Sequence, residues 1–224
     1  MRRGALSLVA GDDPHHAPSQ PVVSDPSRLR TLVKKALTDL SGESSPAVAP
    51  LARWIDTVAR WNERIDLTAA RSDEELVDLL VADAAILATL VDERRAVVDV
   101  GTGAGAPGLP LALLRPDLRV TLVEPLAKRV ALLRTVVGAE RLTSVTVVRG
   151  KGEDLATRFD LAMSRATLPP PAWAALGAKL ADETAIFLAQ GEPPEGEWRV
   201  DRRYAWPLTG ALRRLVLGRA RVAS

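Results

Sequence analysis

The chain has 224 residues, 47% of them hydrophobic and 26% charged, which suits one globular domain with a smaller appendage. It contains no cysteine, which excludes disulfides, thiolate metal sites and a cysteine nucleophile. The two histidines, His15 and His16, are adjacent in a polar stretch, which argues against a histidine-based triad or a zinc site within the fold. We therefore expect no metal. The missing cysteines favour a reducing compartment, and no apolar run approaches the roughly 20 residues of a membrane span, so we expect a cytoplasmic protein.

Residues 1–24 contain three prolines among polar residues and no hydrophobic periodicity, so we predict a disordered tail. A helix then begins with Asp25 as its N-cap and Pro26 in its first turn. Apolar residues recur at helical spacing from there to about residue 90, with breaks near residues 42 and 68. The pattern predicts an N-terminal helical subdomain over 25–95.

Three side chains of this subdomain have more than one interpretation. Trp54 and Trp61 are explained most simply by helix packing, with stacking on a base as the alternative. Asp83 falls on the apolar stripe of the third helix, where a carboxylate needs partners. We expect Asp83 to hold a neighbouring loop, such as the glycine loop described below, with a role in chemistry as the alternative.

From residue 96 onward, short β-branched runs alternate with helical segments, which predicts a parallel sheet covered by helices. The last two strands, over 198–206 and 212–219, have a short connection and must be antiparallel. The predicted strands are 96–100, 119–124, 144–148, 160–163, 184–189 and this final pair. A mostly parallel seven-stranded sheet with a C-terminal antiparallel pair is the layout of a Rossmann-like, class I S-adenosylmethionine (SAM)-dependent methyltransferase, here over 96–224.

A glycine-rich loop follows the first predicted strand, with Gly101, Gly103 and Gly105 directly after Asp99-Val100. Glycines let the backbone turn sharply and bring its N–H groups against a ligand. The second strand ends about 20 residues later at Glu124, an acid suited to accept both hydroxyls of an adenosine ribose. These features alone do not separate NAD from SAM, and Glu124 could instead be an ordinary surface acid.

The next strand ends offer two further candidates. Gly152 and Glu153 follow the third strand, where a methyltransferase borders the adenine; a helix N-terminal acid is the alternative for Glu153. Arg165 follows the fourth strand, where it could orient the methionine carboxylate or an acceptor phosphate, or form a local salt bridge.

The sequence argues against two other nucleotide-binding classes. A dehydrogenase would need a second domain and a proton-transfer residue such as a histidine or a Tyr-x-x-x-Lys pair, and Tyr204 is the only tyrosine. A P-loop would end in Gly-Lys-Ser/Thr, which this loop does not.

The C-terminal segment is strongly basic although the net charge is only +2. From Arg199 to the end, seven arginines stand against one acid, Asp201. This segment is either a phosphate-binding surface or a solvated pair of strands.

Several motifs together resemble the GidB/RsmG family, bacterial methyltransferases that modify a guanine N7 of small-subunit (16S) ribosomal RNA. The likeness covers about residues 50–220 and includes the Gly-x-Gly-x-Gly-x-Pro-Gly-x-Pro loop. The matching segments are Asn62 with Leu67-Thr68, 99–110, 115–124, Lys128-Arg129 with Leu133-Arg134, and Ser164-Arg165-Ala166. The resemblance implies SAM contacts from Gly101, Ala106, the Gly152-Glu153 pair and Arg165, with Glu124 at the ribose.

The chain also departs from the family pattern on the acceptor side. Val81 stands near where the family usually has a histidine, and Gln190 stands where it usually has a lysine. Thr167 replaces an aromatic residue that often follows Ser-Arg-Ala.

We therefore expect methyl transfer from SAM to guanine N7 in 16S rRNA of the small ribosomal subunit, by a monomer. Guanine N7 has a free lone pair, so Arg165 would serve catalysis by positioning and no general base is required. The alternatives are a diverged paralogue that methylates another RNA or a small molecule, and a SAM- or RNA-binding module without turnover.

Overall fold

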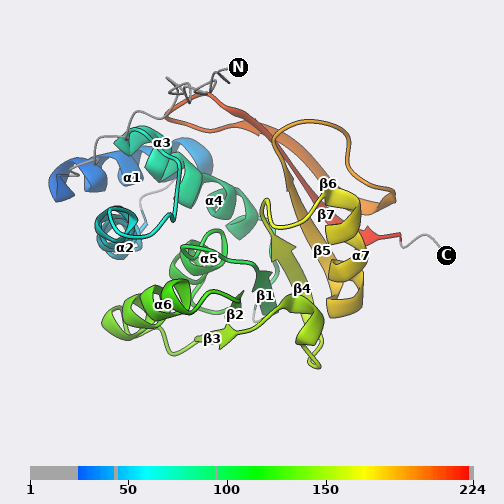
Figure 1. The fold of residues 1–224 in the computed structure, drawn as a ribbon. Helices are drawn as coiled ribbons and strands as arrows, with labels where there is room; N and C mark the ends of the chain where they lie inside the picture. The colour runs from blue at the N-terminus through cyan, green and yellow to red at the C-terminus, as the bar shows by residue number, and fades with distance from the viewer. Residues whose placement is uncertain (1–24, 43–44, 94, 222–224) are drawn as a thin grey trace, which may run out of the picture.

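The computed structural model describes residues 25–42, 45–93 and 95–221, and within them seven strands form one sheet in the order β3-β2-β1-β4-β5-β7-β6. β1 to β5 are parallel, whereas β7 pairs antiparallel with both β5 and β6 (Figure 1). The strands are β1 (Ala96–Val100), β2 (Arg119–Glu124), β3 (Val145–Arg149), β4 (Phe159–Ser164), β5 (Ala181–Leu188), β6 (Gly196–Ala205) and β7 (Leu212–Ala220). This topology confirms the predicted fold class.

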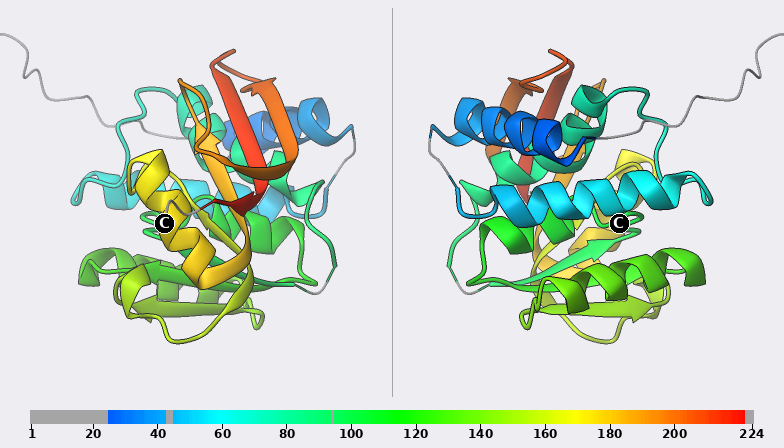
Figure 2. Two further views of the ribbon diagram at one scale, coloured as in Figure 1. Left: turned by 90° about the vertical axis from the view of Figure 1, so that its right-hand side faces the viewer. Right: turned by 90° about the vertical axis from the view of Figure 1, so that its left-hand side faces the viewer.

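Helices cover both faces of the sheet, as the two side views show (Figure 2). α5 (Gly108–Leu114) and α6 (Ala127–Ala139) pack on one face together with the N-terminal helices. α7 (Pro170–Leu180) covers the other face, where Trp173 is buried and donates a hydrogen bond to the Ala185 carbonyl of β5 (2.9 Å). The apolar residues of each strand are therefore enclosed on both sides, as a parallel sheet requires.

The N-terminal helices follow the predicted pattern closely. α1 (Pro26–Ser41) begins at Asp25, whose side chain accepts the Ser27 N–H (2.8 Å), and ends at Gly42 in the left-handed conformation. α2 (Val48–Asn62) follows. The predicted disordered tail over 1–24 lies outside the described residues, and the domain boundary at residue 96 stays a prediction because one buried cluster includes residues on both sides of it.

The third helical segment is interrupted rather than continuous. It consists of α3 (Asp73–Val77), a π-helical turn η1 (Asp78–Ala82) and α4 (Asp83–Ala88). A π-helical turn inserts one residue into the helical spacing, a feature that simple 3.6-residue periodicity does not reveal and that often accompanies functional sites. Here the turn begins at one buried acid, Asp78, and is followed directly by another, Asp83.

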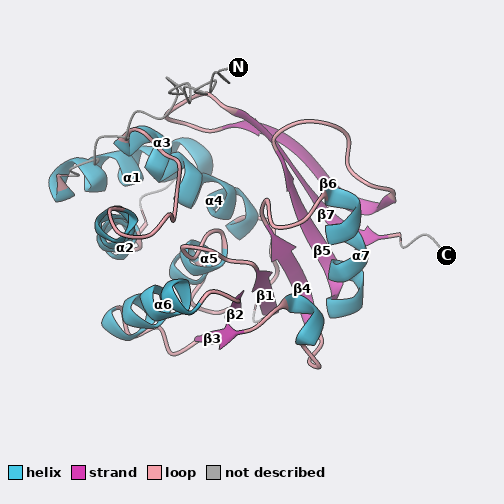
Figure 3. Ribbon diagram, in the orientation of Figure 1, coloured by secondary structure: helices cyan, strands magenta, loops and turns pink. Residues whose placement is uncertain are grey.

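These two acids hold the β6–β7 hairpin, which reaches over α3 and α4 (Figure 3). Asp78 accepts the N–H groups of Leu208 (3.1 Å) and Thr209 (2.8 Å) in the connection between the strands. Asp83 accepts hydrogen bonds from Tyr204 and Trp206. Asp83 therefore holds a neighbouring loop as expected, but that loop is the β6–β7 connection at Trp206 and not the glycine loop.

Within the ranges described, no helix is long and apolar enough to cross a membrane.

Candidate functional site

The predicted ligand-binding residues gather at one edge of the sheet because parallel strands end there together. Val100 of β1 lies opposite Val123 of β2, and Ser164 of β4 lies opposite Ile186 of β5. The glycine loop, Glu124 and Arg165 follow directly from these strand ends. This edge is where ligands bind in open α/β sheets.

The glycine loop has a backbone that other residues would rarely adopt. Gly101, Gly103 and Gly105 have φ values of +68°, +61° and +117°. A Cβ on Gly101 would lie 2.4 Å from the Thr167 hydroxyl oxygen, and one on Gly105 would lie 3.1 Å from the Leu109 and Leu133 side chains. A Cβ on Gly103 would meet nothing closer than 4.0 Å, so at Gly103 the loop is open to an incoming ligand.

Glu124 is almost fully buried at the end of β2, with 2% of its surface exposed. One carboxylate oxygen accepts the Gly103 N–H (3.0 Å) and the other accepts the Leu126 N–H (2.9 Å). The alternative of an ordinary surface acid is therefore wrong. Each oxygen retains a further lone pair, so the carboxylate can anchor the loop and still accept a hydroxyl.

Leu126, two residues beyond this acid, is a candidate that the sequence reasoning missed. Its side chain is 53% exposed although it is large and apolar. An exposed leucine beside a buried carboxylate gives an adenosine an apolar surface for the base and an acceptor for the ribose. In the sequence, the only indication of this role is that a leucine follows two residues after the acid that ends β2.

Asp99 is a second missed residue, buried at the end of β1. Its Oδ2 accepts the Thr102 hydroxyl (2.6 Å) and the Gly108 N–H (2.8 Å). Among the described residues, none donates a hydrogen bond to its Oδ1. Burial raises the pKa of Asp99 from 3.8 to about 6, although the hydrogen bonds from Thr102 and Gly108 oppose the shift.

Ala106, Gly152 and Glu153 differ in their surroundings. Ala106 is buried, and its peptide bond to Pro107 is cis. Gly152 is buried in the short 3₁₀ turn η2 (Gly152–Asp154), where a Cβ would come within 2.7 Å of Val100. Glu153 in the same turn is exposed. Close packing against Val100 therefore explains why residue 152 is a glycine. The contact of Gly152 or Glu153 with adenine stays a prediction.

Arg165 is fixed by the π-helical segment. Its Nη1 donates to the Leu79 carbonyl and to Asp83 Oδ2 (3.2 Å), and only 18% of the side chain is exposed. Asp83 Oδ1 in turn accepts the Tyr204 hydroxyl and the Trp206 indole N–H, each at 2.8 Å. Burial and this carboxylate raise the pKa of Tyr204, so it remains a neutral donor. The local salt bridge considered for Arg165 is present, and it holds the guanidinium at the site.

The arginine-rich C-terminal segment is less free than the sequence suggested. Arg199 pairs with Glu183 (2.5 Å), and Arg214 pairs with both Glu192 (2.5 Å) and Asp201 (2.6 Å). Glu183 and Glu192 precede residue 199 in the sequence. Counting charges from Arg199 to the end therefore leaves out two of the acids that pair with these arginines.

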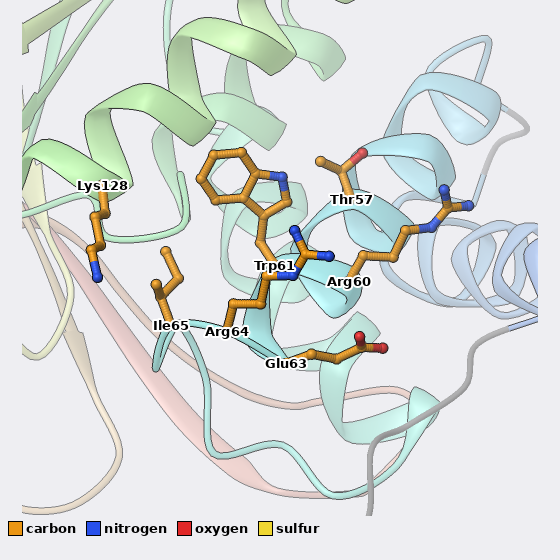
Figure 4. A pocket seen from close by; sticks show the side chains of 7 residues that line it. All are labelled: Thr57, Arg60, Trp61, Glu63, Arg64, Ile65 and Lys128. Atoms are coloured by element: carbon orange, nitrogen blue, oxygen red, sulfur yellow. The ribbon is translucent and has the colours of Figure 1, made fainter.

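A cavity of about 530 Å³ opens between α2 and the start of α6 (Figure 4). Lys128 of α6 lies on one side, with Arg60 and Trp61 of α2 on the other. Trp61 packs partly against the core and also lines this cavity, so part of the residue faces the cavity. The remaining lining residues are Thr57, Glu63, Arg64 and Ile65.

The described part of the chain holds no group of three or more His, Cys, Asp or Glu side chains arranged to bind a metal ion. The sheet order, the antiparallel end and the ligand edge together define a class I SAM-dependent methyltransferase fold.

The chain matches the model of the GidB family, rRNA small subunit methyltransferase G, over residues 48–213, and it belongs to that family. It is 33% identical over 179 residues to ribosomal RNA small subunit methyltransferase G of Desulfitobacterium hafniense, covering 77% of this chain and 73% of that protein. It is 42% identical to the same-named protein of Clostridium beijerinckii over 50% of this chain and 51% of that one, so it spans about half the length of that relative. Among solved structures, TrmK of M. capricolum in complex with S-adenosyl-homocysteine matches with 10% identity and a TM-score of 0.49 over 63% of this chain and 69% of that one, a likeness too distant to bear on function.

Proposed function

We propose that this protein transfers a methyl group from S-adenosylmethionine to N7 of a guanine in 16S rRNA of the small ribosomal subunit. The observation that carries the proposal is the glycine loop held by buried Glu124 at the ligand edge, in a chain of the methyltransferase G family. Other members of the family are named for methylation of small-subunit rRNA.

The residues at this edge offer the cofactor a hydrogen-bond acceptor, an apolar surface and an open stretch of backbone. S-adenosylmethionine supplies a methyl group already activated on a sulfonium. Glu124 accepts the ribose hydroxyls, exposed Leu126 covers one face of the adenine, and open Gly103 lets the backbone approach. The neighbouring backbone of Gly101, Gly105 and Ala106 completes the cradle, and the turn at Gly152-Glu153 borders the adenine.

The acceptor side of the proposed site works by positioning. Guanine N7 carries no proton, so no side chain must remove one. Arg165, held by Asp83 and the Leu79 carbonyl, presents a fixed cation to the methionine carboxylate or to an acceptor phosphate. Because the salt bridge to Asp83 already orders its side chain, Arg165 loses little rotamer entropy on binding.

The cavity at Trp61 suits the RNA. Cationic Arg60, Arg64 and Lys128 surround an indole there, and RNA outside a duplex is bound through phosphate contacts and stacking on aromatic rings. Arg60 is paired with Asp56 (2.5 Å), which leaves Arg64 and Lys128 as the stronger candidates.

The test is transfer of a labelled methyl group to small ribosomal subunits from a strain that lacks the corresponding enzyme, followed by mapping of N7-methylguanosine in 16S rRNA. We expect one new modified guanine. SAM binding, measured by calorimetry, is required by every version of the proposal.

The departures at Val81 and Gln190 favour one alternative, a diverged methyltransferase with another RNA or a small-molecule acceptor. Val81 is fully buried, so the missing histidine leaves an apolar core position, whereas Gln190 lines a surface pocket. SAM binding without methylation of small subunits, but with labelling of another RNA, would support this alternative. SAM binding without any transfer would support a binding module without turnover.

A further inference from the structure

A second pocket, of about 290 Å³, lies at the carboxyl end of β5 against the β6–β7 hairpin. β4 and β5 pair in parallel and end side by side, so the pocket opens at the same sheet edge as Arg165. Its polar lining is mainly cationic, and Leu212, 74% exposed, adds an apolar surface. The lining side chains that matter here are Gln190, Glu192, Arg203, Leu212, Arg213 and Arg214.

Arg213 differs from the other two arginines of this pocket. Arg214 is neutralised by Glu192 and Asp201, and Arg203 lies 3.7 Å from Glu192. Arg213 stacks on the Trp206 ring, 3.8 Å from guanidinium carbon to ring centroid, and donates to the neighbouring Leu212 carbonyl (2.8 Å). No acid in the part of the chain described here forms a salt bridge with it. A guanidinium held over an indole keeps most of its donors available for an anion.

The ring beneath Arg213 is itself fixed to the candidate site. Trp206 is 7% exposed, and its indole N–H donates to Asp83, the carboxylate that also holds Arg165. Arg213, Trp206, Asp83 and Arg165 therefore form one chain of contacts from the hairpin surface to the proposed acceptor position. The two guanidinium groups are thus connected through the buried Trp206 and Asp83.

We propose that this pocket binds a backbone phosphate of the RNA substrate, with Arg213 as its ligand, while the target base lies at Arg165. The inference rests on the proposed function and extends it to a second contact on the acceptor RNA. A planar guanidinium matches a phosphate through two parallel hydrogen bonds, and the exposed Leu212 beside it suits the apolar part of a nucleotide. The RNA backbone fits this pocket because the charge of Arg213, which has no salt bridge in the described residues, is positive and lies on the acceptor side of the sheet edge.

The experiment compares Arg213→Gln, Arg213→Lys and a matched control, Arg158→Gln, in the full chain. Arg158 immediately precedes β4 at the opposite edge of the sheet, where it forms an exposed pair with Asp182. Both glutamine variants lose one positive charge, so the net charge of the protein is the same in each. Binding to 16S rRNA is measured across a range of salt concentrations, and SAM affinity is measured in parallel.

We expect Arg213→Gln to weaken RNA binding by about fivefold and to reduce the slope of log K against log salt by about 1, with SAM affinity unchanged. Arg213→Lys should keep the slope but lose about half of the affinity, because lysine retains the charge without the planar stacking. Arg158→Gln should match the wild type.

Equal RNA affinity and equal salt slope for Arg213→Gln and Arg158→Gln would overturn the pocket assignment while leaving the proposed function intact. A loss of SAM affinity in Arg213→Gln would also overturn it, since the effect would then be on the fold or the cofactor. Wild-type protein that binds SAM but neither binds nor methylates 16S rRNA would overturn the proposed function and this inference with it.

Discussion

Two buried carboxylates, Asp99 and Glu124, lie near the ends of the adjacent strands β1 and β2 beside the glycine loop, and they have different hydrogen-bond partners. Both oxygens of Glu124 accept backbone N–H groups, whereas Asp99 uses only Oδ2, for Thr102 and Gly108. A Cβ on Gly108 would lie 2.7 Å from this Asp99 oxygen, so Asp99 fixes the start of α5 from within. Glu124 is the acid that contacts the open part of the loop.

Replacing Glu124 by glutamine should weaken SAM binding by about 10- to 100-fold. One amide N–H would face a backbone N–H of Gly103 or Leu126, and the group would lose acceptor capacity for the ribose. Calorimetric titration with SAM measures the effect, with Asp182→Asn at the opposite edge of the sheet as the charge-matched control. Unchanged affinity in Glu124→Gln would show that the residue only anchors the loop.

Asp99 should make the stability of the protein depend on pH. Its pKa is raised by burial to about 6 in the folded state against 3.8 as the ordinary value, so the folded state binds a proton that the unfolded state has already released. The stabilising contribution is complete below about pH 4 and is lost as the pH rises through about 6, by up to about 3 kcal/mol. Urea unfolding of the wild type and Asp99→Asn between about pH 4 and pH 7 measures this.

The quantity that tests this prediction is the difference between the two pH profiles, because other groups titrate equally in both proteins. We expect the wild type to lose stability relative to Asp99→Asn as the pH rises. Parallel profiles would show that Asp99 does not titrate in this range.

The positions of individual candidate residues were predictable where the residue lies directly at a strand end. The positions of Glu124 and Arg165 at the ligand edge could be predicted because each comes immediately after a β-branched or apolar run, whereas their contacts with a ligand stay predictions. Leu126 and Asp78 were not, because the exposure of one and the hydrogen bonds of the other depend on segments far away in the sequence. Asp83 was recognised as needing partners, but its partner Trp206 is 123 residues away.

At the scale of elements, local patterns located the strands well, and all seven were predicted within a few residues. The third predicted helix, which follows the break near residue 68 and ends at about residue 90, was predicted without its π-helical turn, since the apolar residues on either side still fit one stripe. Residues five apart lie on the same side of a π-helical turn, so Asp78 and Asp83 both face the hairpin and hold different parts of it.

Replacing Asp78 by alanine should therefore destabilise the protein by about 3 kcal/mol. The change leaves the Leu208 and Thr209 N–H groups and the Thr209 hydroxyl without their charged acceptor. Thr209→Ala removes only one of these hydrogen bonds and should cost about 1 kcal/mol. Denaturant unfolding of both variants measures the difference, and equal losses would contradict the assignment of the two backbone contacts to Asp78.

For the whole molecule, the sheet edge places two cationic cavities on either side of the proposed cofactor position. One lies between α2 and α6 and includes Arg64, and the other lies under the hairpin and includes Arg213. α6 and the hairpin stand at opposite ends of the sheet (Figure 1). An RNA that engages both cavities must cross the ligand edge, which would bring one of its bases to Arg165.

This arrangement predicts that the two cavities contribute independently to RNA binding. Arg64→Gln and Arg213→Gln should each reduce the salt slope of 16S rRNA binding by about 1, and the double variant should reduce it by about 2, since distant contacts add. Affinity for SAM should stay at the wild-type value in all three, because neither arginine contacts the glycine loop or Glu124. A double variant no weaker than one of the single variants would mean that the RNA uses only one cavity, and the path across the ligand edge would then have to be abandoned.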